Sequence, residues 1–424
     1  MTRVRATARR TFAALAVRNF RLYFTGQVIS VSGTWMQMIA QAFLVLSILH
    51  GNGVAIGVAT ALQFLPMLVL GSWGGLVADR VDKRRLLFAT QGAAAALAIA
   101  LAALTLTHTV ELWQVYLLAG LLGVVNLFDN PARQTFVPEM VGPELVPNAV
   151  SLNSVVMNGA RIIGPAIGGV LIVTLGVGVC FLVNALSYLA VIAALSMIRP
   201  AELHRTPPVP RAKGQVREGL RYAWSTRGLR DPLLVMAVVG IFAFNFTTTL
   251  PLLAHFTYHG GAGTYSLFSM AMGAGAVVGG LFVAHRSRPS VRMLAVVGLA
   301  FGAMVLVVAV VPTEAATVVA LVVMGACSIA FISTANATLQ LGADPSMRGR
   351  VMALFAIAFL GSTPIGAPIV GWISDVTSPR VALAVGAVAT LAASASLARR
   401  AFGRPAVALM SEVVPAPAGS PTPA

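Results

Sequence analysis

Twelve apolar stretches, separated by short charged segments, constrain this chain more than any other feature. A helix of about 20 residues crosses the roughly 30 Å hydrocarbon core of a bilayer. Of the 424 residues, 58% are apolar and only 10% are charged, too few charges for the surface of a water-soluble protein. We therefore expect an all-α membrane protein with about 12 transmembrane helices. The expected spans are 22–49, 55–78, 86–107, 112–132, 148–174, 178–198, 231–255, 263–285, 291–311, 315–341, 351–374 and 380–398.

The basic residues predict how these spans are oriented. If twelve spans alternate in direction, every Lys and Arg but two lies on the same side of the membrane. The exceptions are Arg380, on the other side, and Arg161, within a span. The positive-inside rule then puts both termini in the cytoplasm of a cell and makes the chain a multi-pass cell-membrane protein. A net charge of +16 does not indicate a nucleic-acid partner, because the basic residues lie at helix ends without interleaved aromatic residues.

A long polar interruption divides the chain into two halves. We expect a cytoplasmic arm at 1–21, a six-helix bundle at 22–198, a cytoplasmic loop at 199–230, a second bundle at 231–400 and a disordered tail at 401–424. Within the loop, GQVREGLRYAW predicts an amphipathic helix on the membrane surface. The halves resemble degenerate copies: GGLVADR at 74–80 is echoed by GGLFVAHR at 279–286, and ARIIGPAIGGVL at 160–171 by STPIGAPIVGWI at 362–373.

The segment after the second span, GGLVADRVDKRRLL at 74–87, carries a recognisable motif. An acid at the C-terminal end of a helix opposes the helix dipole, so Asp79 should need a nearby cation, and Arg133 is a candidate partner in a conformational latch. The string resembles the signature loop of the major facilitator superfamily, G-x-x-x-D-R-x-G-R-K, with Asp82 in place of the second Gly. The matching residues are Gly75, Asp79, Arg80, Lys83 and Arg84.

A second string, from Asp129 to Gly169, resembles the superfamily branch of enterobactin exporters and macrolide efflux proteins. It includes Gly164, Pro165, Gly168 and Gly169, which fit a helix 5 pattern of antiporters. The resemblance implies two pseudo-repeated six-helix bundles in the major facilitator fold and proton-driven efflux by alternating access. Physically, the glycines permit close helix packing, and Pro165 leaves a carbonyl without its donor, so packing and hinge roles are both open.

Polar residues at helical spacing mark candidate cavity faces, because a polar side chain facing lipid is costly. The resemblance places helices 1, 4, 7 and 10 around the cavity with helix 5 beside it. The alternative is hydrogen bonding between helices of the scaffold. The stripes are Gln27, Ser30, Thr34, Gln37 and Gln41 on helix 1, Ser151, Ser154, Asn158 and Arg161 on helix 5, Asn245 and Thr249 on helix 7, and Ser333, Asn336 and Gln340 on helix 10.

Arg161 and Asp129 are the charged candidates within the spans. A lone cation at mid-membrane costs about 2.5–3.5 kcal/mol, so Arg161 should meet an anionic or carbonyl-rich substrate, pair with a residue such as Asp129, or join helices. Asp129 is the acid best placed to couple transport to protons, since Glu111, Glu314 and Asp375 fall near the opposite surface.

The leading hypothesis is a proton-coupled secondary transporter that exports a small hydrophobic or siderophore-like molecule. An ion-coupled importer and a membrane scaffold or receptor are the alternatives. No HExxH, CxxC or nucleotide-binding GxxxxGK[ST] pattern occurs, so neither an enzyme nor a metal or other cofactor is expected. The expected partners are a small-molecule substrate, protons and membrane lipid, with the monomer as the functional unit.

Overall fold

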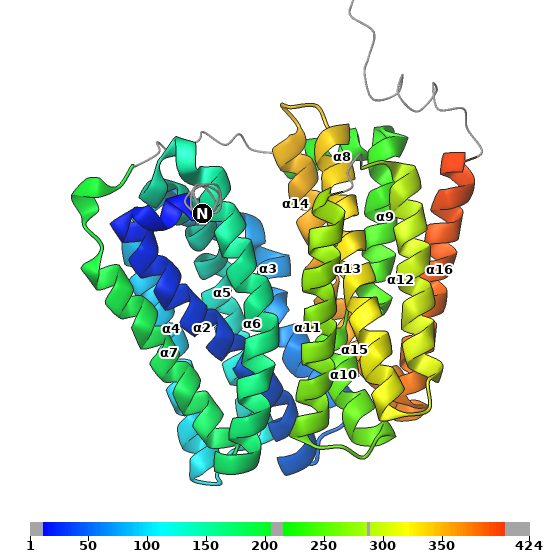
Figure 1. The fold of residues 1–424 in the computed structure, drawn as a ribbon, viewed down its shortest axis with the longest axis horizontal. Coiled ribbons are helices and arrows are strands. Elements are labelled where there is room, and N and C mark those ends of the chain that lie inside the picture. Colours follow the sequence, from blue (N-terminus) through cyan, green and yellow to red (C-terminus); the bar gives the residue numbers. More distant parts are fainter. Residues whose placement is uncertain (1–11, 205–214, 286–288, 403–424) are drawn as a thin grey trace, which may run out of the picture.

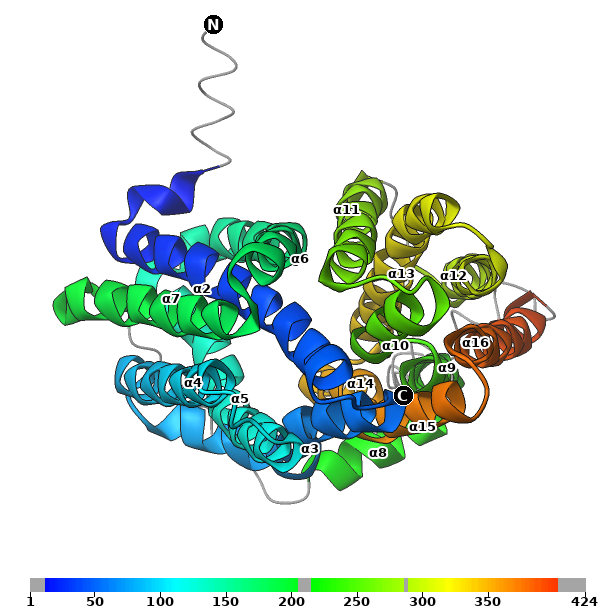
Figure 2. The ribbon, with the colours of Figure 1, turned by 90° about the horizontal axis from the view of Figure 1, so that it is seen from below.

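The computed structural model describes residues 12–204, 215–285 and 289–402 (Figures 1 and 2). These residues are almost entirely helical. The helices are α2 (Arg18–Phe43), α3 (Gly53–Arg80), α4 (Lys83–Leu106), α5 (Leu112–Val141), α6 (Val146–Leu175), α7 (Val177–Met197), α8 (Gln215–Ser225), α9 (Arg227–Phe242), α10 (Phe246–Leu252), α11 (Ala262–His285), α12 (Val291–Val310), α13 (Glu314–Gly342), α14 (Arg348–Phe359), α15 (Thr363–Val376) and α16 (Pro379–Phe402).

The predicted count of membrane spans is confirmed. Twelve helical segments of the described residues are long and apolar enough to cross a membrane. Their chain order matches the twelve predicted stretches, with α9 and α10 together forming the seventh span and α14 and α15 the eleventh. The predicted arm, the Pro-rich part of the central loop and the tail lie largely outside the described residues.

The helix ends follow from local chemistry. Asn52 and Asp82 accept hydrogen bonds from the first turns of α3 and α4, at 3.0 Å each, and satisfy amides that have no partner within the helix. Asp82 is the residue that replaces the second Gly of the signature pattern, and its side chain caps α4. Gly142 and Gly176 end α5 and α6 at φ values of 75° and 86°, which favour glycine.

The helices form two bundles, α2–α7 and α9–α16, which meet along two helix pairs (Figure 2). The N-terminal half of α3 crosses α15, and α6 crosses α11. These four helices also carry the two internal sequence echoes, one in α3 and α11 and the other in α6 and α15. The helices that carry the echoes are therefore the ones that build the seam, although the echoed segment of α3, at 74–80, lies outside the half that crosses α15.

At one end of the seam the two bundles are joined directly. This end, which we call the distal end, lies opposite the end that carries Arg18 and Phe402 (Figure 1). The Asp375 carboxylate of α15 accepts hydrogen bonds from the backbone N–H groups of Gly53 and Val54, at 2.6 and 2.8 Å. An anion is favourable at the N-terminus of a helix, so Asp375 ties α15 to the start of α3.

Glycines allow the backbones to approach at the same place. A Cβ atom at Gly53 would lie 2.5 Å from the carbonyl oxygen of Gly371, and one at Gly57 equally close to that of Ala367. Such contacts leave no room for a methyl group against rigid backbone. The distal end of the seam therefore depends on small residues from both bundles.

Two spans are interrupted, which the sequence analysis did not predict. The seventh changes direction between α9 and α10, where the Asn245 side chain donates hydrogen bonds to the carbonyls of Gly240 and Ile241 at 3.3 and 2.6 Å. These carbonyls belong to the last turn of α9 and lack helical donors. The eleventh breaks between α14 and α15, next to Gly361.

The fourth span is longer than predicted. The predicted end at 132 places Arg133 in a connecting segment, whereas α5 continues to Val141 through Pro131 and Pro138. A proline inside a helix removes one hydrogen bond and does not end the helix where packing supports it. Arg133 therefore lies inside the first bundle.

The predicted amphipathic helix of the central loop is present as α8. Leu220 and Trp224, four residues apart, are exposed on one face. The other face contacts the second bundle, where Tyr222 hydrogen bonds to Asp344 at 3.1 Å and Glu218 pairs with Arg350 at 2.8 Å.

Substituting Gly371 with Val should weaken the distal contact, because the added atoms meet the backbone of Gly53. Spin labels at Thr109 and Ala315 report the distance between the bundles at this end. The labelled protein carries Ala in place of Cys180 and Cys327. We expect the distance distribution to shift toward longer values. Gly120→Val is the control, since no atom lies within 4 Å of a Cβ there. An unchanged distribution in Gly371→Val would show that the glycine contact does not hold this end together.

Candidate functional site

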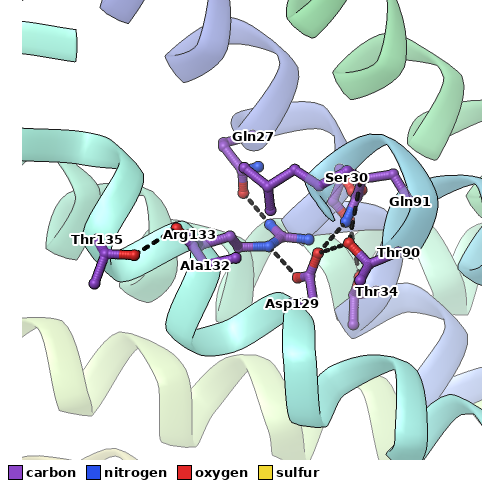
Figure 3. A network of polar contacts seen from close by, with 10 residues as sticks. Gln27, Ser30, Thr34, Thr90, Gln91, Asp129, Ala132, Arg133 and Thr135 are labelled. Carbon is purple, nitrogen blue, oxygen red and sulfur yellow. Dashed lines mark hydrogen bonds and ion pairs between the residues drawn. The ribbon is translucent and has the colours of Figure 1, made fainter. Parts of the chain in front are cut away.

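A network of buried polar side chains joins three helices of the first bundle (Figure 3). Asp129 of α5, only 3% exposed, accepts hydrogen bonds from Thr90 and Gln91 of α4, each at 2.7 Å. Arg133 forms an ion pair with Asp129 one turn earlier on α5 and donates a hydrogen bond to Gln27 of α2. A carboxylate therefore lies within a mostly apolar bundle with three polar partners, one of which is in turn bonded to Gln27.

This network offsets the free-energy cost of burying the charges of Asp129 and Arg133. Removing two ions from water costs several kcal/mol for each, and their attraction compensates only when further hydrogen bonds satisfy the remaining atoms. Thr90 and Gln91 supply such bonds to one oxygen of Asp129, while Gln27 accepts from the other side of Arg133. Nearby, Gln27 Nε2, Ser30 Oγ and Gln91 Oε1 are buried without a partner among the described residues. The cluster thus has hydrogen-bonding capacity that its own side chains do not use.

The predicted helix 1 stripe divides between scaffold and cavity. Gln37 accepts a hydrogen bond from Asn184 of α7 at 2.6 Å, so it joins helices within the bundle, and it also lines a small pocket together with Gln41. Ser30 is fully buried beside the Asp129 network, and Thr34 donates to the Ser30 carbonyl at 3.0 Å. Neither side chain is placed in an open cavity. Gln27 contributes to the charged network.

Gln41, at the far end of the stripe, does border open space. It lines two adjoining pockets, one of which lies between the bundles because Thr247 of α10 closes it from the other side. The lining of that pocket is mainly apolar with a few polar groups, as is usual for small-molecule sites. Its residues are Met38, Gln41, Ala42, Val45, Ile56, Ala59, Thr60, Gln63, Phe64 and Thr247.

The polar stripe of helix 5 lies on the cavity side of α6. Ile163, Ile167 and Val170 are exposed on one face of this helix, as expected for contact with lipid. Arg161 lies about 200° around the helix from Ile163, and Asn158 about 140°, so both point away from that face. On α6, Gly164 belongs to the row of residues that packs on α2, and Gly169 belongs to the row that packs on α11. The polar stripe runs between these two rows.

Exposure along this stripe falls with depth. Ser151 and Ser154, near the start of α6, are exposed, whereas Asn158 and Arg161 are partly buried. A polar face that is turned away from lipid and still exposed borders space between the bundles. This face is therefore most accessible at the end of α6 that carries Ser151 and least accessible near Arg161.

Arg161 lies against Trp35 of α2. Its guanidinium carbon is 5.2 Å from the centre of the indole ring, a cation–π contact. Among the described residues it forms no ion pair, because Asp129 pairs with Arg133 instead. The predicted alternative of an Arg161–Asp129 pair was therefore wrong.

The predicted residues of helices 7 and 10 differ in environment. Asn245 is 1% exposed and supports the break between α9 and α10, so its assignment to the cavity was wrong. Thr249 is also buried and donates to the Asn245 carbonyl at 3.2 Å. Ser333 and Asn336 of α13 are partly exposed, and Gln340 is exposed. Of these two stripes, the helix 10 stripe is therefore the one that reaches an accessible surface.

The signature loop is held by contacts at the ends of its helices. Lys83 pairs with Glu139 of α5 at 2.6 Å, and Arg84 donates to the Leu195 carbonyl of α7 at 2.8 Å. Arg80 is exposed. The Asp79 side chain lies outside the described part of the structure, and Arg133, its predicted partner, contacts Asp129 and Gln27.

The glycines of helix 5 serve packing on both sides. A Cβ at Gly164 would lie 2.7 Å from the Ser32 carbonyl of α2, and one at Gly169 the same distance from Ser266 Oγ of α11. Gly168 packs on Met36. The α6 helix runs without a break through Pro165. Close packing, one of the two roles left open, is therefore what the described structure contains.

Several site residues were missed by sequence reasoning. Thr90 and Gln91 hold Asp129, and Trp35 faces Arg161, but none of them belongs to a polar stripe. An adjacent Thr-Gln pair inside a span was a usable signal, because polar groups there need partners. Trp35 gave no signal, since aromatic residues are common in membrane helices.

Comparison with known proteins establishes the family. The chain matches the family model described as transmembrane secretion effector over residues 9–412. It belongs to this family of major facilitator transporters. The predicted superfamily and the predicted absence of enzymatic function are confirmed by this match and by the names of the relatives.

The relatives are transporters and efflux proteins. The chain is 28% identical to the staphyloferrin A transporter of Staphylococcus aureus over 59% of its own length and 62% of that protein's. It is 26% identical to the multidrug efflux pump Tap of Mycolicibacterium fortuitum, over 81% and 86% of the two chains. It is 20% identical to macrolide efflux protein A of Streptococcus pyogenes, over 79% and 86%.

Solved structures show the same fold. A bacterial homologue of the human lysosomal transporter Spinster, in an inward-facing and unoccupied conformation, superposes with a TM-score of 0.69. The two chains are 13% identical, and 93% and 97% of them are covered. The predicted fold of two six-helix bundles is thereby confirmed.

Replacing Asp129 with Ala should destabilise the protein by about 3–5 kcal/mol, because it leaves Arg133 buried without its counter-ion. Thermal unfolding in detergent measures this loss. The double variant Asp129→Asn with Arg133→Gln should recover much of it. Glu202→Gln, which breaks an exposed pair with Arg199, is the control and should cost less than about 1 kcal/mol. Equal losses at the two pairs would contradict the account of the buried network.

Proposed function

We propose that this major facilitator protein exports a small hydrophobic or siderophore-like molecule across the cell membrane, driven by protons through alternating access. The observation that carries the proposal is the asymmetry of the seam. Asp375 and the glycines join the bundles at the distal end, while the polar face of α6 is accessible toward the other end. Such a state loads a substrate from one side only.

The direction of export depends on the orientation of the chain. The positive-inside rule places the accessible end in the cytoplasm, because the connecting segments at that end carry nearly all the Lys and Arg. The state described is then open to the cytoplasm, with the distal end toward the outside. A relative named as a multidrug efflux pump supports export. We propose that one chain suffices for the cycle, since the pocket is formed by its two bundles.

Asp129 is the proposed coupling residue. Of the two buried acids on α5, Asp129 and Glu139, Asp129 lies further from the end of the helix. It lies one turn from Arg133, and the network around it reaches α2 through Gln27. Protonation would weaken the ion pair and release Arg133 and Gln27 from their present contacts. The contacts of α2 would thus change when the Asp129 carboxylate gains or loses a proton.

Transport itself is tested in cells. We expect cells that produce the protein to accumulate less of at least one compound among siderophores, macrolides and lipophilic dyes than cells with an empty vector. A proton-gradient uncoupler should abolish the difference. If accumulation is lower with the protein and unaffected by the uncoupler, proton coupling is wrong. Greater accumulation with the protein would instead indicate import.

The role of Asp129 is tested by its amide variant. Asp129→Asn retains the size of the side chain and removes the proton site, so counter-flow of substrate without a gradient should persist while uphill export is lost. Proteoliposomes with imposed pH gradients measure both. Glu139→Gln, which breaks the other partly buried pair of this bundle, is the control and should retain gradient-driven export. An unchanged pH dependence in Asp129→Asn would remove this residue from the coupling mechanism.

A further inference from the structure

The Arg161 guanidinium is a cation without a counter-ion inside the first bundle's cavity face. Arg133, another arginine within a span of this bundle, has its charge balanced by Asp129. Arg161 has the Trp35 ring at 5.2 Å and, among the described residues, neither an ion pair nor a hydrogen bond from its side chain. A lone cation within a span is costly, and such residues mark substrate or ion pathways.

The contact with Trp35 leaves the hydrogen-bonding capacity of Arg161 unused. A guanidinium that lies over an aromatic ring is attracted through its face, while its N–H donors lie in its own plane. Those donors form a fork that matches the two oxygens of a carboxylate. The ring therefore holds the cation in place without neutralising it.

An apolar pocket begins close to this cation. Met38, one turn along α2 from Trp35, is the first residue of the pocket shared by the two bundles. Further along, Ala42, Val45 and Phe64 make its lining largely apolar. A helical turn rises about 5 Å, so the first lining residue lies about that far along α2 from Trp35, the residue that Arg161 contacts.

We propose that Arg161 and Trp35 form a recognition site for an anionic group, of the carboxylate class, on the transported molecule. The apolar part of that molecule lies toward the pocket lined by Met38 and Phe64, which at about 30 Å³ in this state must widen to admit it. The preferred cargo is then an amphipathic organic anion, and organic cations are disfavoured by charge repulsion with Arg161. This inference rests on the proposed transport function and specifies its substrate class.

Two dyes with the same three-ring core and opposite charge test the proposal. Fluorescein carries a carboxylate, and tetramethylrhodamine methyl ester is a cation. Fluorescence anisotropy with the protein in nanodiscs measures the affinity for each, and empty nanodiscs correct for partition into lipid. We expect fluorescein to bind about tenfold tighter than the cation, since one charge-assisted contact changes affinity by about that factor.

Variants of Arg161 and Trp35 test whether the difference in dye affinity arises at these two residues. Arg161→Gln should weaken fluorescein binding about tenfold, Arg161→Lys should retain part of it, and Trp35→Ala should weaken it less than Arg161→Gln. Arg21→Gln, at an exposed arginine of α2, is the matched control and should bind as the wild type does. A melting curve confirms that each variant is folded. If Arg161→Gln does not fold, the comparison of Arg161→Lys with Arg21→Lys replaces it.

Equal affinity for the two dyes, binding of neither dye, or fluorescein binding that Arg161 variants leave unchanged would overturn the proposal. The assay needs no gradient, so it is independent of transport. If fluorescein binds through Arg161 and is not moved in proteoliposomes, the binding site stands and the proposed export function is the part that is wrong.

Discussion

The close approach of α3 to α15 at the distal end is the contact on which the rest of this structure depends. Backbone meets backbone there because Gly53, Gly57 and Gly371 carry no side chain, and the Asp375 carboxylate satisfies two amides of the α3 N-terminus. A second crossing, of α6 and α11, uses Gly169 and Gly273. With the bundles joined at this end, the polar face of α6 is left accessible at the other.

The charged side chains of α5 and α6 have different surroundings. On α5 the Asp129–Arg133 pair is neutral as a unit and is enclosed by Thr90, Gln91 and Gln27, so its energy changes when a proton is added. On α6 the Arg161 charge has only an aromatic ring beside it. The first arrangement is suited to a proton and the second to an anion.

Sequence reasoning predicted the helices well and the site in part. Hydrophobic length determines a span almost alone, so the twelve segments and the surface helix α8 followed from composition. The breaks near Asn245 and Gly361 did not, because a short irregular turn barely changes average hydropathy. Periodicity placed Gln37 and Gln41 on one stripe, yet Gln37 bonds to Asn184 and Gln41 lines a pocket. Spacing gives a helical face, whereas the partner of that face depends on tertiary packing.

The central claim is that the cavity is reached from one side of the membrane at a time. The accessibility of the cavity is measured by labelling Asn158→Cys with a membrane-impermeant maleimide, in a variant without Cys180 and Cys327. Vesicles of each orientation report reaction from each side of the membrane. Without a gradient, we expect reaction from the side that carries the termini. Substrate and a proton gradient should lower that rate and raise the rate from the opposite side. Reaction from both sides at once, or from one side under every condition, would contradict alternating access.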